Sequence, residues 1–138
     1  MKELNCILLI DDNPDDNFYH TYVINEAKAA KQVKAALTGE EALVYFEKTE
    51  TDPENYPYPD LVFLDINMPG MNGFEFLEVA KERKIITETK PVVVIMLSSS
   101  LNPFDETKTK KDFFNEVKEF QNKPLTIEML EEIMNKYF

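Results

Sequence analysis

The stretch LVFLDINMPGMNG, residues 61–73, joins a short apolar run to an acid and then to a sharp turn. Four apolar residues without a break are typical of a strand that is buried on both faces, as in a parallel sheet. The proline and the glycines that follow indicate a turn soon after Asp65. The stretch therefore predicts a central strand that delivers one carboxylate to the edge of a sheet.

Four similar runs alternate with helix-patterned segments along the rest of the chain. The predicted strands are residues 6–10, 32–37, 61–64, 92–97 and 117–122. The predicted helices begin at residues that commonly cap them, namely Asn13, Thr38, Asn72, Asn102 and Thr126. Five strand–helix repeats predict an α/β fold with a doubly wound parallel sheet and helices on both faces. The length of 138 residues suits a single domain, residues 1–138.

The charge balance excludes several classes of partner. Acids outnumber bases by 26 to 15, and the formal net charge is -11, which argues against binding to nucleic acid or to an anionic membrane surface. No apolar stretch approaches the 18 residues of a membrane span. The single cysteine, Cys6, cannot form an internal disulfide, so we expect a protein of the reducing cytoplasm.

Polar residues follow four of the five predicted strands. They are Asp11 and Asp12 after the first, Asp65 after the third, Ser98, Ser99 and Ser100 after the fourth, and Lys123 after the fifth. The carboxyl ends of parallel strands meet at one edge, where open α/β sheets bind ligands. Crowded carboxylates need a counter-charge, which a hard cation such as Mg²⁺ and the lysine ammonium can supply. Such a site suits phosphoryl transfer, in which a carboxylate can itself be the nucleophile.

Four motifs in this order resemble those of a response-regulator receiver domain of two-component signalling. They are LLIDDNPDD, LDINMPGMNG, IMLSSS and NKP, and the resemblance covers essentially the whole chain. It implies a flavodoxin-like (βα)5 fold with strand order 2-1-3-4-5. It also implies a Mg²⁺-dependent phosphoacceptor that receives a phosphoryl group from a histidine kinase and signals through a conformational switch.

The resemblance implies four residues for the phosphoacceptor and metal site. Asp65 corresponds to the phosphoacceptor and also to a Mg²⁺ ligand. Asp12 corresponds to a direct ligand of the metal, and Asp11 to a ligand that acts through water. Asn67, two residues beyond the acceptor, would offer its backbone carbonyl to the metal.

Lys123, Ser98 and Phe120 correspond to the residues that respond to the phosphoryl group. Lys123 would hold a phosphoryl oxygen, and Ser98 would be the switch hydroxyl that moves toward the group. Ser99 is a rival for this role, because the run from Pro91 is longer than expected. Phe120 would be the ring that rotates inward with the hydroxyl.

The resemblance also implies the partners. They are a histidine kinase or phosphotransfer protein of a phosphorelay and a downstream protein target, which would bind the face of the fourth helix, fifth strand and fifth helix. We expect no output domain within the 138 residues, and either a monomer or a homodimer. The domain would not be an enzyme beyond self-catalysed phosphotransfer and autodephosphorylation.

Three other functions remain open. A degenerate receiver would act only as a protein-binding module. A phosphatase of the haloacid dehalogenase type would need a second acid two residues beyond the nucleophile, where this chain has Asn67. A carrier of FMN would need a phosphate-binding loop after the first strand, where DDNPDD would repel phosphate. His20, the single histidine, is interpreted as a packing or helix-surface residue.

Overall fold

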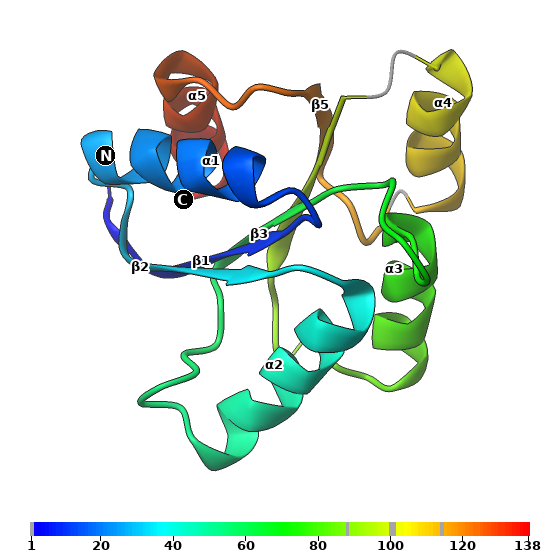
Figure 1. The fold of residues 1–138 in the computed structure, drawn as a ribbon, viewed down its shortest axis with the longest axis horizontal. Helices are drawn as coiled ribbons and strands as arrows, with labels where there is room; N and C mark the ends of the chain where they lie inside the picture. Colours follow the sequence, from blue (N-terminus) through cyan, green and yellow to red (C-terminus); the bar gives the residue numbers. More distant parts are fainter. Residues whose placement is uncertain (1, 88, 100–101, 114) are drawn as a thin grey trace.

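Strands and helices alternate along the chain from end to end (Figure 1). The computed structural model describes residues 2–87, 89–99, 102–113 and 115–138. Within them, the strands are β1 (Leu4–Ile10), β2 (Ala30–Ala36), β3 (Leu61–Leu64), β4 (Val93–Ser98) and β5 (Glu119–Asn122). The helices are α1 (Pro14–Glu26), α2 (Gly39–Thr51), α3 (Gly73–Glu82), α4 (Pro103–Asp112) and α5 (Ile127–Tyr137).

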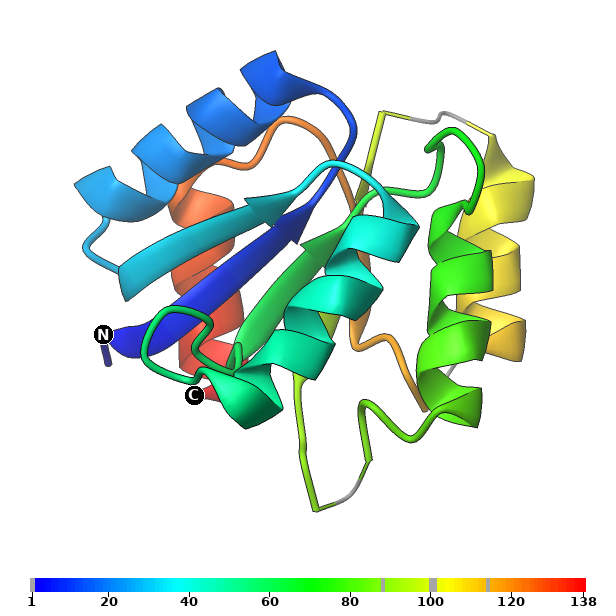
Figure 2. The same ribbon diagram turned by 60° about the horizontal axis from the view of Figure 1, so that its bottom comes forward.

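The strands form one parallel sheet in the order β2-β1-β3-β4-β5 (Figure 2). This confirms the predicted flavodoxin-like topology. The register aligns the carboxyl ends of the central strands, because Leu64 pairs with both Ile10 of β1 and Met96 of β4. Ser98 pairs with Asn122 at the end of β5. The residues that follow these strands are therefore brought to the same edge.

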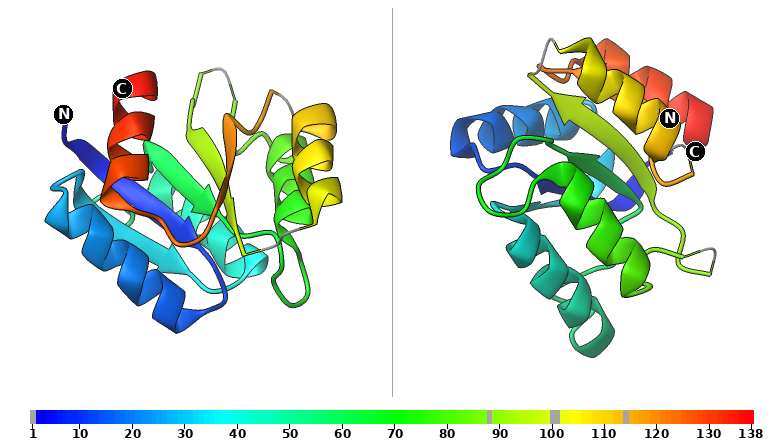
Figure 3. Two further views of the ribbon diagram at one scale, coloured as in Figure 1. Left: turned by 90° about the horizontal axis from the view of Figure 1, so that it is seen from above. Right: turned by 90° about the vertical axis from the view of Figure 1, so that its right-hand side faces the viewer.

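The helices cover both faces of the sheet. Helices α1 and α5 lie on one face, and α2, α3 and α4 lie on the other (Figures 1 and 3). Each face has its own apolar core, in which alternate residues of the strands contact the helices. Helices α3 and α4 lie side by side, where the rings of Phe74 and Phe113 stack with their centroids 5.3 Å apart.

Burial differs between central and edge strands. The side chains of β3 are all buried, as the unbroken run LVFL predicts, and Cys6 in β1 is buried too. The prediction that every strand is buried on both faces is wrong for β2 and β5, which are the edges of the sheet and are only partly covered. The fourth strand also extends one residue further than predicted, so Ser98 lies within β4.

Side-chain caps begin all five helices, as predicted. The oxygens of Asn13, Thr38, Asn72, Asn102 and Thr126 each accept a hydrogen bond from the first turn of the helix that follows. Helix α4 is polar nearly all round, and Thr109 is its single buried residue. Among the described residues, no helix is long and apolar enough to cross a membrane.

The loop after β3 packs tightly against the start of α3. Gly70 has a φ of 74°, a left-handed conformation that glycine adopts readily. Gly73 begins α3 and donates its backbone N–H to the carbonyl of Ile66 at 2.8 Å. A Cβ at Gly73 would lie under 3.0 Å from the backbone carbonyl oxygen of Asp65. The absence of a side chain therefore allows α3 to start directly beside the acid.

Polar contacts fix two outlying segments. The hydroxyl of Tyr45 in α2 donates to the carbonyl of Pro57 at 2.6 Å, which holds the proline-rich loop before β3. At the edge of the sheet formed by β5, Glu119 accepts a hydrogen bond from the hydroxyl of Tyr137 at 2.7 Å and forms an ion pair with Lys136 at 3.3 Å. These contacts join the last turn of α5 to β5.

Candidate functional site

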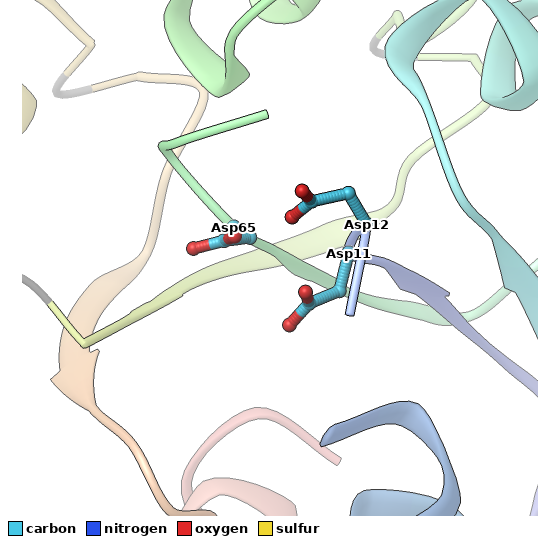
Figure 4. A group of neighbouring side chains, drawn as sticks. All are labelled: Asp11, Asp12 and Asp65. Atoms are coloured by element: carbon cyan, nitrogen blue, oxygen red, sulfur yellow. The ribbon is translucent and has the colours of Figure 1, made fainter. Parts of the chain in front are cut away.

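Three carboxylates meet where β1 and β3 end (Figure 4). Asp11 and Asp12 directly follow β1, and Asp65 directly follows β3. One oxygen from each lies within 4.8 Å of the other two. Asp11 and Asp65 are buried, at 5% and 6% exposure, whereas Asp12 is exposed. The structure thus brings together the three acids that the strand pattern placed at one edge.

Lys123 supplies the positive charge of this cluster. Its Nζ lies 2.6 Å from Oδ2 of Asp11, 2.8 Å from Oδ2 of Asp16 and 3.8 Å from Oδ1 of Asp65. Burial opposes the charged form of Lys123, but its hydrogen bonds to Asp11 and Asp16 outweigh burial and raise the pKa of the ammonium. The backbone N–H of Lys123 also donates to the carbonyl of Ser98 at 2.8 Å, which ties the lysine to the end of β4.

The environment of Asp65 disfavours its ionised form. Burial raises the pKa of Asp65 to about 6, and the negative charge of Asp11 acts in the same direction. Oδ1 of Asp65 accepts one hydrogen bond, from the backbone N–H of Ile66 at 3.0 Å. A cation bound beside Asp65 would oppose both effects and favour the ionised carboxylate.

Asp11 is held in place from the start of α1. Its Oδ1 accepts from the backbone N–H of Asn13 at 3.0 Å, and its backbone carbonyl accepts from Nδ2 of Asn17 at 2.9 Å. Asn17 is buried, and its Oδ1 has no hydrogen-bond partner among the described residues. These contacts leave Oδ2 of Asp11 to the ammonium of Lys123.

The remaining predicted residues differ in burial. Ser98 is fully buried at the end of β4, and Ser99 beside it is exposed, while Ser100 lies outside the described residues. Asn67 is exposed in the loop two residues after Asp65. Phe120 is half-buried in β5 and packs against the core formed with α2 and α3. Ser98 is the buried serine of the pair, and its role as the switch hydroxyl stays a prediction.

The sequence interpretation missed Asp16, which it would place only in the first turn of a helix. The carboxylate of Asp16 instead contacts Lys123, 107 residues away. A signal was present, because Asp16 precedes His20 by four residues and therefore lies on the same helix face. His20 is a buried packing residue at 2% exposure, and burial, followed by the charge of Lys123, lowers its pKa. An acid on this inward face has reason to pair with a cation.

The donor set suits a hard divalent cation. The three carboxylates offer oxygen ligands, which Mg²⁺ and Ca²⁺ prefer over nitrogen or sulfur. Because Asp12 is exposed, a bound ion could keep several of its waters, as Mg²⁺ commonly does. Among the described residues, no histidine or cysteine side chain belongs to the cluster. Because zinc is usually bound by these side chains, the cluster suits Mg²⁺ or Ca²⁺ better than zinc.

Comparisons with known proteins agree with this geometry. The family model of the response regulator receiver domain matches residues 7–135. The two-component response regulator ARR17 of Arabidopsis thaliana is 31% identical over 137 residues, which cover 96% of this chain and 84% of that protein. The crystal structure of a two-component response regulator from Cytophaga hutchinsonii superposes with a TM-score of 0.83 and 30% sequence identity, over 98% of this chain and 97% of that chain.

Other relatives match through one part of a longer protein. The nitrate/nitrite response regulator protein NarL of Escherichia coli (strain K12) is 37% identical over 84 residues, which are 61% of this chain and 35% of NarL. The chain thus spans about a third of the length of that relative. The shared fold, the cluster of three carboxylates and the family match lead to one conclusion: the chain belongs to the response regulator receiver domain family of two-component signalling.

Proposed function

We propose that the chain is a response regulator receiver domain in which Asp65 accepts a phosphoryl group from a histidine kinase or a phosphotransfer protein. The observation that carries this proposal is the position of Asp65. It is a buried acid at the end of a central strand, with two further carboxylates and one ammonium around it. A nucleophile, a site for a divalent cation and a fixed positive charge are the parts that phosphoryl transfer requires.

The transfer itself forms one bond and breaks another. A carboxylate oxygen of Asp65 bonds to phosphorus while the bond between phosphorus and the donor imidazole nitrogen breaks, and the imidazole leaves with the electron pair. Asp12 and Asp65 would hold Mg²⁺ directly, Asp11 through water and Asn67 through its backbone carbonyl. The ion would neutralise charge on the transferring oxygens.

Lys123 would bind a phosphoryl oxygen on the other side of the group. Two of its three N–H donors point to Asp11 and Asp16, at 2.6 and 2.8 Å. Its distance of 3.8 Å from Asp65 leaves the third donor for an oxygen of the phosphoryl group. The resting position of Lys123 therefore supports its proposed role.

The response to phosphorylation would pass through Ser98 and Phe120. The hydroxyl of Ser98 would move toward the phosphoryl group, and the ring of Phe120 would turn into the space that it leaves. Phe120 lines a surface cleft together with Lys110 of α4 and Lys118 before β5. Inward rotation would change the shape of this cleft, so the face of α4, β5 and α5 would bind the downstream protein.

The phosphoacceptor is tested by labelling with radioactive acetyl phosphate in the presence of Mg²⁺. We expect the wild-type protein to be labelled, EDTA to prevent labelling, and Asp65→Asn to abolish it. Asp15→Asn is the matched control, because Asp15 is an exposed acid near the same edge. Undiminished labelling of Asp65→Asn would refute the assignment, and an unlabelled wild-type protein would favour a receiver that only binds partners.

A further inference from the structure

The ammonium of Lys123 has a second strong partner that lies outside the metal-binding cluster. Of the acids around it, Asp11 and Asp65 belong to the three-carboxylate cluster, whereas Asp16 does not. Asp16 is in the first turn of α1, where its backbone N–H donates to Oδ1 of Asn13 at 3.2 Å. The capped helix thus fixes the place from which Asp16 reaches the lysine.

We propose that Asp16 is a positioning residue that holds Lys123 toward α1 and so keeps the carboxylate of Asp65 available to a divalent cation. The inference rests on the proposed function, because it concerns how the same site binds its metal ion. It follows from a competition, because an ammonium and a metal ion are attracted to the same carboxylate oxygens.

In the unphosphorylated protein, the ammonium of Lys123 lies closer to Asp16 than to Asp65. Lys123 lies 2.8 Å from Asp16 but 3.8 Å from Asp65, which is beyond hydrogen-bond distance. If Asp16 were neutral, the nearest remaining anion besides Asp11 would be Asp65. The ammonium would move toward Asp65 and occupy the oxygens that a cation needs.

The exposure of Asp16 suits it to this task. Its side chain is 36% exposed, against 7% for that of Asp65, and it lies outside the three-carboxylate cluster. A divalent cation bound by the cluster would therefore leave the contact between Asp16 and Lys123 in place. Lys123 then still has an anionic partner, which lowers the cost of displacing it from Asp11.

Mg²⁺ affinity of the unphosphorylated protein tests the proposal, measured by NMR titration with MgCl₂. The matched control for Asp16→Asn is Asp15→Asn, which removes the same charge from the adjacent position. Asp15 is exposed and forms no ion pair within the described residues. We expect Asp16→Asn to weaken Mg²⁺ binding about fivefold more than Asp15→Asn does.

A double-mutant cycle with Lys123→Met shows whether the effect passes through the lysine. In the Lys123→Met background, Asp16→Asn and Asp15→Asn should have equal effects on Mg²⁺ affinity. In a crystal structure of Asp16→Asn, Nζ of Lys123 should lie within about 3.2 Å of an Asp65 oxygen. If Asp16→Asn lowers the melting temperature, Asp16→Ser provides the second variant.

Three results would overturn the proposal. Equal Mg²⁺ affinities of Asp16→Asn and Asp15→Asn would show that Asp16 acts only as a distant charge. A full effect of Asp16→Asn in the Lys123→Met background would show that the lysine is not involved. In both cases, the proposed role of Asp65 as phosphoacceptor would still stand if the wild-type protein binds Mg²⁺. The third result is a wild-type protein that binds no Mg²⁺, which would refute both the proposed function and this inference.

Discussion

Replacement of Gly73 by alanine tests the close contact between α3 and the acid. A Cβ at this position would lie under 3.0 Å from the carbonyl oxygen of Asp65, 3.1 Å from Cα of Ile66 and 3.2 Å from the carbonyl carbon of Asp65. All three are backbone atoms, so no side-chain rotation relieves the clash. Either α3 or the end of β3 has to move.

The expected cost follows from two opposing effects. Alanine favours a helix over glycine by about 0.5–1 kcal/mol, whereas a methyl group forced into a packed site costs about 1–3 kcal/mol. Because this clash is with backbone, we expect the upper end of that range and a net loss of about 2 kcal/mol. For a domain of 138 residues, this lowers the melting temperature by about 5–10 °C.

Gly39 provides the matched control, since it begins α2 as Gly73 begins α3. The three atoms nearest to a Cβ at Gly39 would all belong to the side chain of Met71, with Sδ at 2.8 Å. The thioether is flexible and can move aside, so Gly39→Ala should change the free energy of unfolding by less than about 1 kcal/mol. Urea unfolding followed by circular dichroism measures both variants.

Gly73→Ala should also slow the phosphorylation of Asp65. A displaced end of β3 moves the carboxylate of Asp65 relative to Lys123, so we expect Gly73→Ala to be labelled more slowly by acetyl phosphate than Gly39→Ala. If both variants were as stable as the wild-type protein and were labelled equally fast, the contact at Gly73 would not be a constraint on the acid.

Three further predictions concern pH, metal and the proline-rich loop. The pKa of Asp65 is raised to about 6, so between about pH 4 and 6 the folded state binds more protons than the unfolded state, and stability should fall as pH rises through this window. Asp65→Asn should remove that fall and raise the free energy of unfolding at pH 7.5 by about 1–3 kcal/mol in EDTA, measured by urea unfolding; a pH profile unchanged by the substitution would contradict the burial argument. Mg²⁺ at ten times its dissociation constant should add about 1.4 kcal/mol, and EDTA should reverse this; a melting temperature insensitive to Mg²⁺ would mean that the three carboxylates hold no ion. Tyr45→Phe removes the hydrogen bond to Pro57 and should cost about 1 kcal/mol in thermal unfolding without slowing phosphorylation, while slower labelling would tie the loop to the site.

The edge of the sheet at which the site lies could be predicted from the sequence, because this prediction needs only the positions of the strands and helices along the chain. The run before Asp65 and the alternation of strands and helices are enough to bring Asp11, Asp65 and Lys123 together. Partial burial of β2 and β5 could not be derived in this way, because it depends on which strands lie at the edges. Strand order came from the family resemblance and not from periodicity.

The partner of Asp16 was beyond local reasoning for a different reason. An acid in the first turn of a helix already has a sufficient explanation in the helix dipole. Its contact with Lys123 depends on how α1 lies across the sheet relative to the end of β5, which no short motif encodes. The exposure of Asp12 and the burial of Asp11 likewise follow from the path of the chain into α1, although both acids occupy adjacent positions.

The contacts between Glu119 and the end of α5 make the C-terminal turn a natural attachment point for a reporter. Glu119 adjoins Phe120, and it is bonded to Tyr137 and paired with Lys136. A fluorophore or spin label placed on the exposed side of this turn is therefore coupled mechanically to β5. Its signal would follow displacement of that strand in real time, with no need to label the three-carboxylate cluster itself.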